Sequence, residues 1–226
     1  MRKIGMIAAM NGELNAMLEK MEGLEELPVK HEKKVLFSKY GDKEIYMTES
    51  GVGEIFSASA AQHLISSYGV EAIVNFGVCG SLSKELGLKK TVLVKGVVHY
   101  EMDTSAIDGV EVGRYTCFPS VVIPTDGDLY AKALSLNPSL YGAICASGNK
   151  FIESAEDKKY LRDTFGADVC EMEAAGIALT CHANGIPCLL VKAVSDGEGG
   201  AEEFHRTVDE AARVYTDLVL NLIKII

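Results

Sequence analysis

The chain has 226 residues, of which 48% are hydrophobic and 24% charged, a balance typical of a globular protein with a sizeable core. Its formal net charge of −10 argues against a nucleic-acid partner, because such binding depends on clustered Lys and Arg residues. No apolar run approaches the ~18 residues of a membrane span, and the first ten residues lack the pattern of a signal peptide. We therefore expect a cytoplasmic protein without a membrane partner.

The six cysteines form no C-x-x-C pair, and most of them lie in apolar runs such as GAICAS and PCLLVKAV. This pattern is typical of buried, reduced thiols rather than of a disulfide framework or a zinc site. No metal site is therefore expected.

The first half of the chain alternates apolar runs with helical patterns. The predicted elements are a buried strand over 3–10, a helix over 11–21 capped by Asn11, strands over 34–40 and 44–49, and a helix over 53–68 that ends at Gly69. Strands over 71–76 and 91–99 follow, and residues 100–125 are predicted to be irregular.

The second half continues the alternation. The predicted elements are a helix over 126–136, a strand over 142–147, a helix over 156–165, a strand over 168–170, a helix over 171–183, a strand over 188–194 and one long amphipathic helix from Phe204 onward. The pattern predicts an α/β fold with a central mixed, twisted sheet flanked by helices on both faces. No linker interrupts the sequence, so a single domain over 1–226 is expected.

Polar residues follow several of the predicted strands, where open α/β sheets bind their ligands. Glu13 follows the first strand, Asp196 follows the strand over 188–194, and Glu173 lies in a Glu-Met-Glu segment predicted to open a helix. Each residue also has a structural interpretation: Glu13 and Glu173 can complement a helix dipole, and Asp196 can belong to a turn. Phe151 and Met172 can equally be core residues.

Taken together, these segments resemble the methylthioadenosine/S-adenosylhomocysteine nucleosidases, within the wider family of purine nucleoside phosphorylases. The resemblance is colinear over nearly the whole chain. It includes residues 4–10 with Glu13, Ser50-Gly51-Val52-Gly53, Ser147-Gly148 with Phe151-Ile152, Val169-Cys170-Glu171-Met172-Glu173-Ala174, and Ala193-Val194-Ser195-Asp196.

The resemblance implies a purine nucleosidase in which Glu13 is the general base on the attacking water and Asp196 protonates purine N7. The substrate-binding residues that it implies are Gly80 beside the base, Phe151 stacked on it, Ile152 reading its edge, Met172 against the sugar, Glu173 on the ribose hydroxyls, and Ser195. Independently, cleavage of a ribosyl C–N bond calls for an acid near the base and a carboxylate near the water. Polar residues at a sheet edge contribute little packing, so we expect Glu13→Gln and Asp196→Asn to stay folded.

The implied partners are a small-molecule purine nucleoside and a second copy of the chain in a homodimer. No cofactor is implied, since the sequence has no Walker A motif and no G-x-G-x-x-G motif. The sequence departs from the family's pattern at Asn149, Lys192, Val78-Cys79, the short Gly197–Gly200 stretch and residues 103–107. These departures leave the exact nucleoside and its 5′-substituent open.

Three alternatives remain at this point. A phosphate-dependent nucleoside phosphorylase would need a cationic phosphate cradle, whereas the first loop offers Asn11, Gly12 and Glu13. A related hydrolase could act on another purine nucleoside, such as futalosine. A nucleoside-binding protein of the same fold would not need both an acid and a base.

Overall fold

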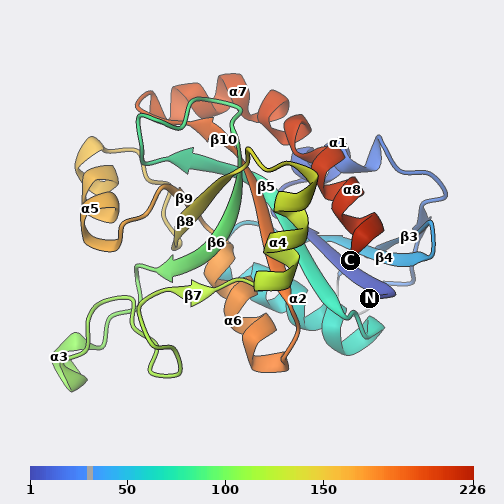
Figure 1. Cartoon of the computed structure of the whole chain (residues 1–226), viewed down its shortest axis with the longest axis horizontal. Helices are drawn as coiled ribbons and strands as arrows, with labels where there is room; N and C mark the ends of the chain where they lie inside the picture. Colours follow the sequence, from blue (N-terminus) through green and yellow to red (C-terminus); the bar gives the residue numbers. More distant parts are fainter. Residues whose placement is uncertain (30–32) are drawn as a thin grey trace.

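The computed structural model describes residues 1–29 and 33–226. In the described residues, ten strands form one mixed sheet (Figure 1). They are β1 (Lys3–Ala8), β2 (Glu25–Glu26), β3 (Leu36–Tyr40), β4 (Lys43–Glu49), β5 (Ala72–Ser81), β6 (Thr91–His99), β7 (Ile123–Pro124), β8 (Tyr141–Ser147), β9 (Val169–Glu171) and β10 (Cys188–Asp196).

The strand order is β10-β6-β8-β9-β5-β1-β4-β3-β2, with β7 paired to β6. Strand β10 also pairs with β5, in parallel, so β5, β10, β6, β8 and β9 form a closed ring. Strand β5 is buried along its whole length and contacts β1, β9 and β10. Strand β5 therefore joins the ring to the rest of the sheet. The polar residues that follow β1 and β10, which run parallel to β5, lie toward the carboxyl end of β5.

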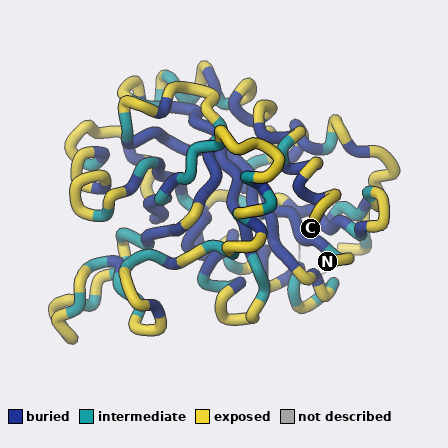
Figure 2. The backbone as a smooth tube through the Cα atoms, viewed as in Figure 1, coloured by how far each residue is buried: buried dark blue, intermediate teal, exposed yellow. Residues whose placement is uncertain are grey.

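Helices cover both faces of the sheet. They are α1 (Asn11–Leu18), α2 (Glu54–Tyr68), α3 (Ser105–Asp108), α4 (Gly127–Leu136), α5 (Ala155–Phe165), α6 (Ala174–Asn184), α7 (Gly200–Val214) and α8 (Thr216–Ile225). One apolar core packs α1, α4, α7 and α8 against the sheet, and a second core packs α2 and α6 against it. Buried residues concentrate in the central strands, with exposed residues along the outer turns (Figure 2). The predicted mixed α/β fold is confirmed.

Several predicted boundaries were wrong for identifiable reasons. Asn11 does not cap α1; the carboxylate of Glu13 instead accepts the N–H of Met10. The helix predicted over 171–183 begins only at Ala174, because Glu171 ends β9 and its carboxylate accepts the N–H groups of Glu173 and Ala174. The long closing helix is two helices, separated at Tyr215, whose buried ring lies 5.7 Å from that of Phe76.

Residues 100–125 also differ from the prediction, since they contain the short helix α3 and strand β7. Five of the six cysteines are buried as free thiols, as predicted, and Cys117 is exposed. Within the described part of the chain, no helix is long and apolar enough to cross a membrane.

Candidate active site

The carboxylate of Glu13 is buried at the carboxyl end of β1, where three backbone N–H groups hold it. Its Oε1 accepts the N–H of Val78 at 2.7 Å, and its Oε2 accepts those of Ala9 at 3.0 Å and Met10 at 2.9 Å. A Cβ at position 77 would lie 2.6 Å from Oε1, so the close approach of β5 to this carboxylate requires Gly77. The carboxylate is therefore fixed in one orientation.

Burial raises the pKa of Glu13, because it disfavours the charged form. The ammonium of Lys192 and the three backbone N–H groups act in the opposite direction, but the net shift is upward. A buried carboxylate with a raised pKa is better suited to accepting a proton near neutral pH than an exposed one.

Glu173 lies between β9 and α6, and its side chain reaches across to the turn that precedes α2. Its Oε1 accepts the N–H of Gly53 at 2.8 Å, and its backbone carbonyl accepts the hydroxyl of Ser57 at 3.0 Å. Burial, and next the neighbouring carboxylate of Glu171, raise the pKa of Glu173, whereas Lys192 lowers it. Met172 precedes it in the bend and is half-buried.

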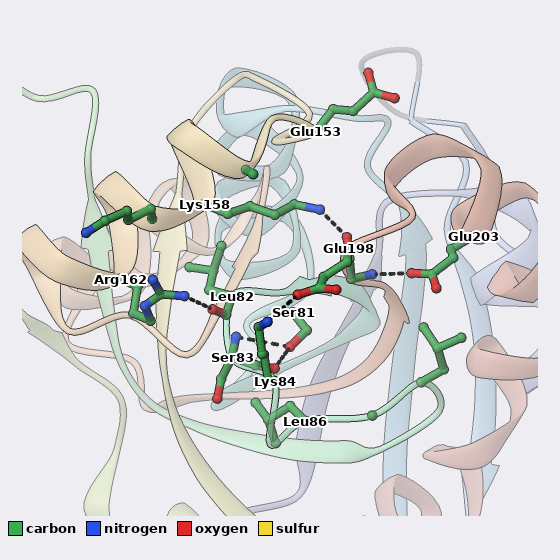
Figure 3. A pocket seen from close by; sticks show the side chains of 15 residues that line it. Ser81, Leu82, Ser83, Lys84, Leu86, Glu153, Lys158, Arg162, Glu198 and Glu203 are labelled. Atoms are coloured by element: carbon green, nitrogen blue, oxygen red, sulfur yellow. Dashed lines mark hydrogen bonds and ion pairs between the residues drawn. The ribbon is translucent and has the colours of Figure 1, made fainter.

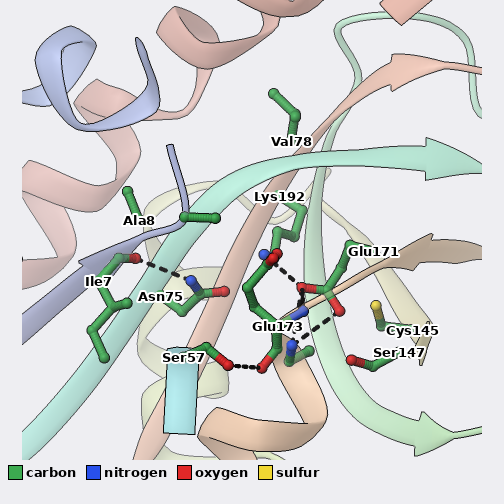
Figure 4. A network of polar contacts seen from close by, with 12 residues as sticks. Ile7, Ala8, Ser57, Asn75, Val78, Cys145, Ser147, Glu171, Glu173 and Lys192 are labelled. Atoms are coloured by element: carbon green, nitrogen blue, oxygen red, sulfur yellow. Dashed lines mark hydrogen bonds and ion pairs between the residues drawn. The ribbon is translucent and has the colours of Figure 1, made fainter. Parts of the chain in front are cut away.

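Lys192 lies among these carboxylates, inside the sheet (Figure 4). Its Nζ is 3.0 Å from Oε2 of Glu171, and both side chains are almost completely buried. Burial alone would lower the pKa of Lys192, but attraction to Glu171, Glu173 and Glu13 outweighs it, so the net pKa is raised. The ammonium therefore stays charged and balances a group of carboxylates that would otherwise repel one another.

Asp196 ends β10 at the level of Gly80 on the neighbouring β5. The hydroxyl of Ser195 donates to its Oδ1 at 2.8 Å, and a Cβ at position 80 would lie 2.9 Å from its Oδ2. Burial raises the pKa of Asp196, although the hydrogen bond from Ser195 and the nearby Lys158 lower it. Gly80, Ser195 and Asp196, which the sequence predicted as site residues, are thus brought together.

Strand β5 sets the spacing between the two candidate catalytic carboxylates. Glu13 contacts β5 at Gly77 and Val78, whereas Asp196 contacts it at Gly80. With a rise of about 3.3 Å per residue, these levels, two to three residues apart, are separated by roughly 7–10 Å along the strand. This spacing suits a nucleoside that places its sugar near Glu13 and its base near Asp196.

Phe151 and Ile152 follow β8 and differ in how far their side chains are exposed. The ring of Phe151 is 39% exposed and lies edge-on to that of Phe204 on α7, with 5.7 Å between the ring centres. Ile152 is buried in a small core with Leu82 and Cys170. Phe204 packs against the apolar core, as its helical spacing predicts, and its ring also contacts that of Phe151, which the sequence does not predict.

Both ends of the Asn149 amide are hydrogen-bonded, the oxygen to a backbone N–H and the nitrogen to two carboxylates. Its Oδ1 accepts the N–H of Glu54 at 3.0 Å, and its Nδ2 donates to Glu54 at 3.2 Å and to Glu101 at 3.4 Å. Glu54, Glu101 and His99 are the group in the described residues whose ligand atoms, within 4.8 Å of one another, could hold a metal ion. In this structure His99 Nε2 lies 2.9 Å from Glu54, and Glu54 and Glu101 both accept from the Asn149 amide.

Two hollows flank this region. One, of about 740 Å³, lies beside Gly197, directly after Asp196, and is lined by Ser81 to Leu88, Glu153, α5 and Glu203 (Figure 3). The other, of about 560 Å³, lies between α1, the β3–β4 hairpin and the start of α2. Its lining includes Ser50 and Gly51, in the turn that holds Glu173.

Comparisons with known proteins identify the family of the chain. A family model described as the phosphorylase superfamily matches residues 3–224. The chain is 31% identical to an aminodeoxyfutalosine nucleosidase of Campylobacter jejuni, over 98% of both chains. It is 30% identical to a 5′-methylthioadenosine/S-adenosylhomocysteine nucleosidase of Staphylococcus haemolyticus, over 99% of this chain and 100% of the relative.

A solved structure of the 5′-methylthioadenosine/S-adenosylhomocysteine nucleosidase of Helicobacter pylori superposes with a TM-score of 0.94 and 28% identity, covering 100% of this chain and 99% of that one. The match extends over the whole sheet and the elements that carry the buried carboxylates. The chain therefore belongs to the phosphorylase superfamily, and within it to the methylthioadenosine/S-adenosylhomocysteine nucleosidase family.

Proposed function

We propose that this protein hydrolyses the N-glycosidic bond of 5′-substituted adenine nucleosides of the methylthioadenosine and S-adenosylhomocysteine type, releasing adenine and a 5-substituted ribose. The observation that carries the proposal is the pair of buried carboxylates, Glu13 and Asp196, which contact β5 at levels roughly 7–10 Å apart, with Glu173 buried nearby. Cleavage of a ribosyl bond develops positive charge on the sugar and negative charge on the base. One carboxylate at each end meets both demands.

Glu13 is the general base in this mechanism. It removes a proton from the water that attacks the anomeric carbon, and its raised pKa supports that role. The three backbone N–H groups hold the carboxylate in position, so little reorganisation accompanies the reaction.

Asp196 is the general acid and donates its proton to N7 of the departing base. A carboxyl group must be protonated to donate, and burial favours that state by raising its pKa. The hydroxyl of Ser195 fixes one carboxyl oxygen at 2.8 Å, which supports a role for Ser195 in orienting the acid.

The remaining site residues bind the substrate. Glu173 accepts the ribose hydroxyls, with Met172 against the sugar, while Lys192 balances the buried negative charge. On the base side, Phe151 stacks on the purine and Phe204 supports its ring, as their edge-to-face contact indicates. Gly80 leaves room beside Asp196, and the backbone at Ile152 reads the edge of the base.

A second candidate substrate is aminodeoxyfutalosine. The relative with 31% identity is an aminodeoxyfutalosine nucleosidase, and the bond proposed to break would be of the same kind. The hollow beside the turn at Ser50 and Gly51 offers space for a 5′-substituent larger than a methylthio group. The residues proposed for catalysis are unchanged in this alternative.

Hydrolysis is expected to be independent of phosphate. The site presents the Glu13 carboxylate to the attacking group, and Lys192, the buried cation nearby, is already balanced by carboxylates. A phosphate ion would be repelled there. Release of adenine from methylthioadenosine, S-adenosylhomocysteine, aminodeoxyfutalosine and adenosine should be measured with and without inorganic phosphate. A ribose 1-phosphate product, formed at a rate proportional to phosphate, would identify a phosphorylase instead.

We also propose that the protein is a homodimer. Val52, Ile55 and Phe56 at the start of α2 are exposed, Ile55 by 82%, and such apolar groups are typical of an interface. Ile107, 90% exposed, lies on α3, which projects away from the sheet (Figure 1). Sedimentation velocity should give twice the chain mass of 24.3 kDa, and Ile55→Asp should shift it to the monomer. A wild-type chain that sediments as a monomer contradicts the proposal.

A further inference from the structure

Two side chains of opposite charge hold the backbone of Gly197, which follows Asp196: one bonds to its carbonyl and the other to its N–H. The Nζ of Lys158, on α5, donates to the carbonyl of Gly197, and the Oε2 of Glu203, on α7, accepts the N–H of Gly197 at 2.8 Å (Figure 3). The same Glu203 oxygen accepts the N–H of Gly199 at 3.2 Å. The backbone just beyond Asp196 is therefore fixed from both sides, by helices that are distant in sequence.

Lys158 is an unusual residue for its position. It is only 7% exposed, and in the described part of the chain no carboxylate lies within 4.0 Å of its ammonium group. A buried cation that bonds to a carbonyl costs free energy that an apolar side chain would not. We therefore look for a functional reason for this buried cation in its contact with Gly197, which directly follows Asp196.

The loop that these residues hold needs external support. It reads Gly197-Glu198-Gly199-Gly200, and a chain with three glycines in four residues has high conformational freedom. Glu198 points to the exposed side, where its carboxylate pairs with Lys84 at 3.1 Å. The bonds from Lys158 and Glu203 restrict the backbone of Gly197, the residue that directly follows Asp196.

The groups that face Asp196 come from five elements. They are Ser195 on β10, Cys79 on β5, Cys170 on β9, Lys158 on α5 and Glu203 on α7. Burial raises the pKa of Cys170 to about 12 and that of Cys79 well above its usual range, so both thiols are neutral near pH 7. Among these five residues, Lys158 and Glu203 are therefore the two that carry a charge.

We propose that Lys158 and Glu203 form a clamp on the backbone of Gly197, which positions Asp196 and sets the pH range in which it donates its proton. The inference rests on the proposed function, because it assigns positioning residues to the acid of that reaction. The two charges act in opposite directions: Lys158 favours the carboxylate form of Asp196, and Glu203 favours the protonated form.

The pH dependence of kcat/KM for the best substrate tests the clamp. A general acid must be protonated, so the rate falls as pH rises through its pKa, on the alkaline limb. Lys158→Met should move this limb to higher pH by about 0.5–1 unit, and Glu203→Gln should move it to lower pH by a similar amount. Lys158→Arg should restore the wild-type limb. Glu198→Gln removes an equal charge from the same loop without touching Gly197, and should leave the limb in place.

Asp196→Asn distinguishes a wrong assignment of the catalytic acid from a wrong assignment of the clamp alone. It should lower kcat by at least ~10² and abolish the alkaline limb. If this variant keeps near-full activity, the acid is misassigned, and both the proposed mechanism and the clamp fall. If it loses activity but the limbs of Lys158→Met and Glu203→Gln coincide with that of Glu198→Gln, the clamp alone is overturned. Thermal unfolding checks each variant, and Glu203→Gln decides the result if Lys158→Met does not fold.

Discussion

Replacing Glu13 with glutamine is expected to lower kcat by about 10²–10⁴, the usual contribution of a positioned general base. The amide nitrogen cannot accept a proton from water, whereas the buried carboxylate, with its raised pKa, can. Substrate binding should change less than kcat, because the proposed contacts to ribose and base come from other residues. Steady-state kinetics with methylthioadenosine, fitted for kcat and KM separately, is the measurement.

The same substitution is expected to affect stability, contrary to what the sequence alone predicts. The sequence placed Glu13 at an open sheet edge, but its carboxylate is buried and accepts three backbone N–H groups. Glutamine offers one oxygen, so its NH₂ group must face a backbone N–H. We expect a loss of about 1–3 kcal/mol in the free energy of unfolding, which urea titration can measure.

Glu19→Gln is a matched control, since Glu19 follows the same helix but is exposed and pairs with Arg213. It should change neither kcat nor stability appreciably. A Glu13→Gln variant that folds and keeps near-wild-type kcat would show that the base lies elsewhere.

Adenine nucleosides are expected to exceed hypoxanthine nucleosides in kcat/KM by at least ~10², and by up to ~10⁴–10⁵ where the hydrogen bonds to the base are well formed. A backbone carbonyl and N–H at Ile152 can accept from the exocyclic amine and donate to N1. Hypoxanthine inverts both positions and would leave buried polar groups unpaired.

Asn149 was the residue most able to change this preference, because a neutral amide can donate or accept. Its oxygen accepts the backbone N–H of Glu54 and its nitrogen donates to Glu54 and Glu101, so we expect it to take no part in base recognition. Methylthioadenosine and methylthioinosine share the same 5′-substituent, so their kcat/KM ratio isolates the base. Equal values, or a preference for the inosine analogue, would exclude adenine specificity.

The sequence predicted the parts of the site that depend on strand ends. Glu13 and Asp196 follow apolar runs that become β1 and β10, and parallel pairing with β5 brings both to one edge. It could not predict Lys158, Glu203 or Phe204, because each lies on a helix whose pattern is ordinary. Their proposed roles depend on contacts between elements distant in the chain, and local periodicity carries no information about such contacts.

The errors in the element boundaries have a related origin. The Glu171–Met172–Glu173 segment has carboxylates where a first helical turn commonly has them, so a helix was expected there. The fold uses Glu171 instead to end β9, to pair with Lys192 and to accept two N–H groups at the start of α6. The buried ion pair between Glu171 and Lys192 thus outweighs the local preference of this segment for a helix.

The pairing of β5 has a consequence for how the chain reaches this structure. β5 completes its contacts only with β9 and with β10, which begins at Cys188, more than a hundred residues later. During synthesis, the apolar segment Ala72–Ser81 therefore has an unsatisfied edge until most of the chain has emerged. Sheets with such distant partners fold slowly and expose strands that self-associate. The burial that fixes Glu13 and Asp196 along β5 thus makes β5 the segment most in need of protection in the nascent chain.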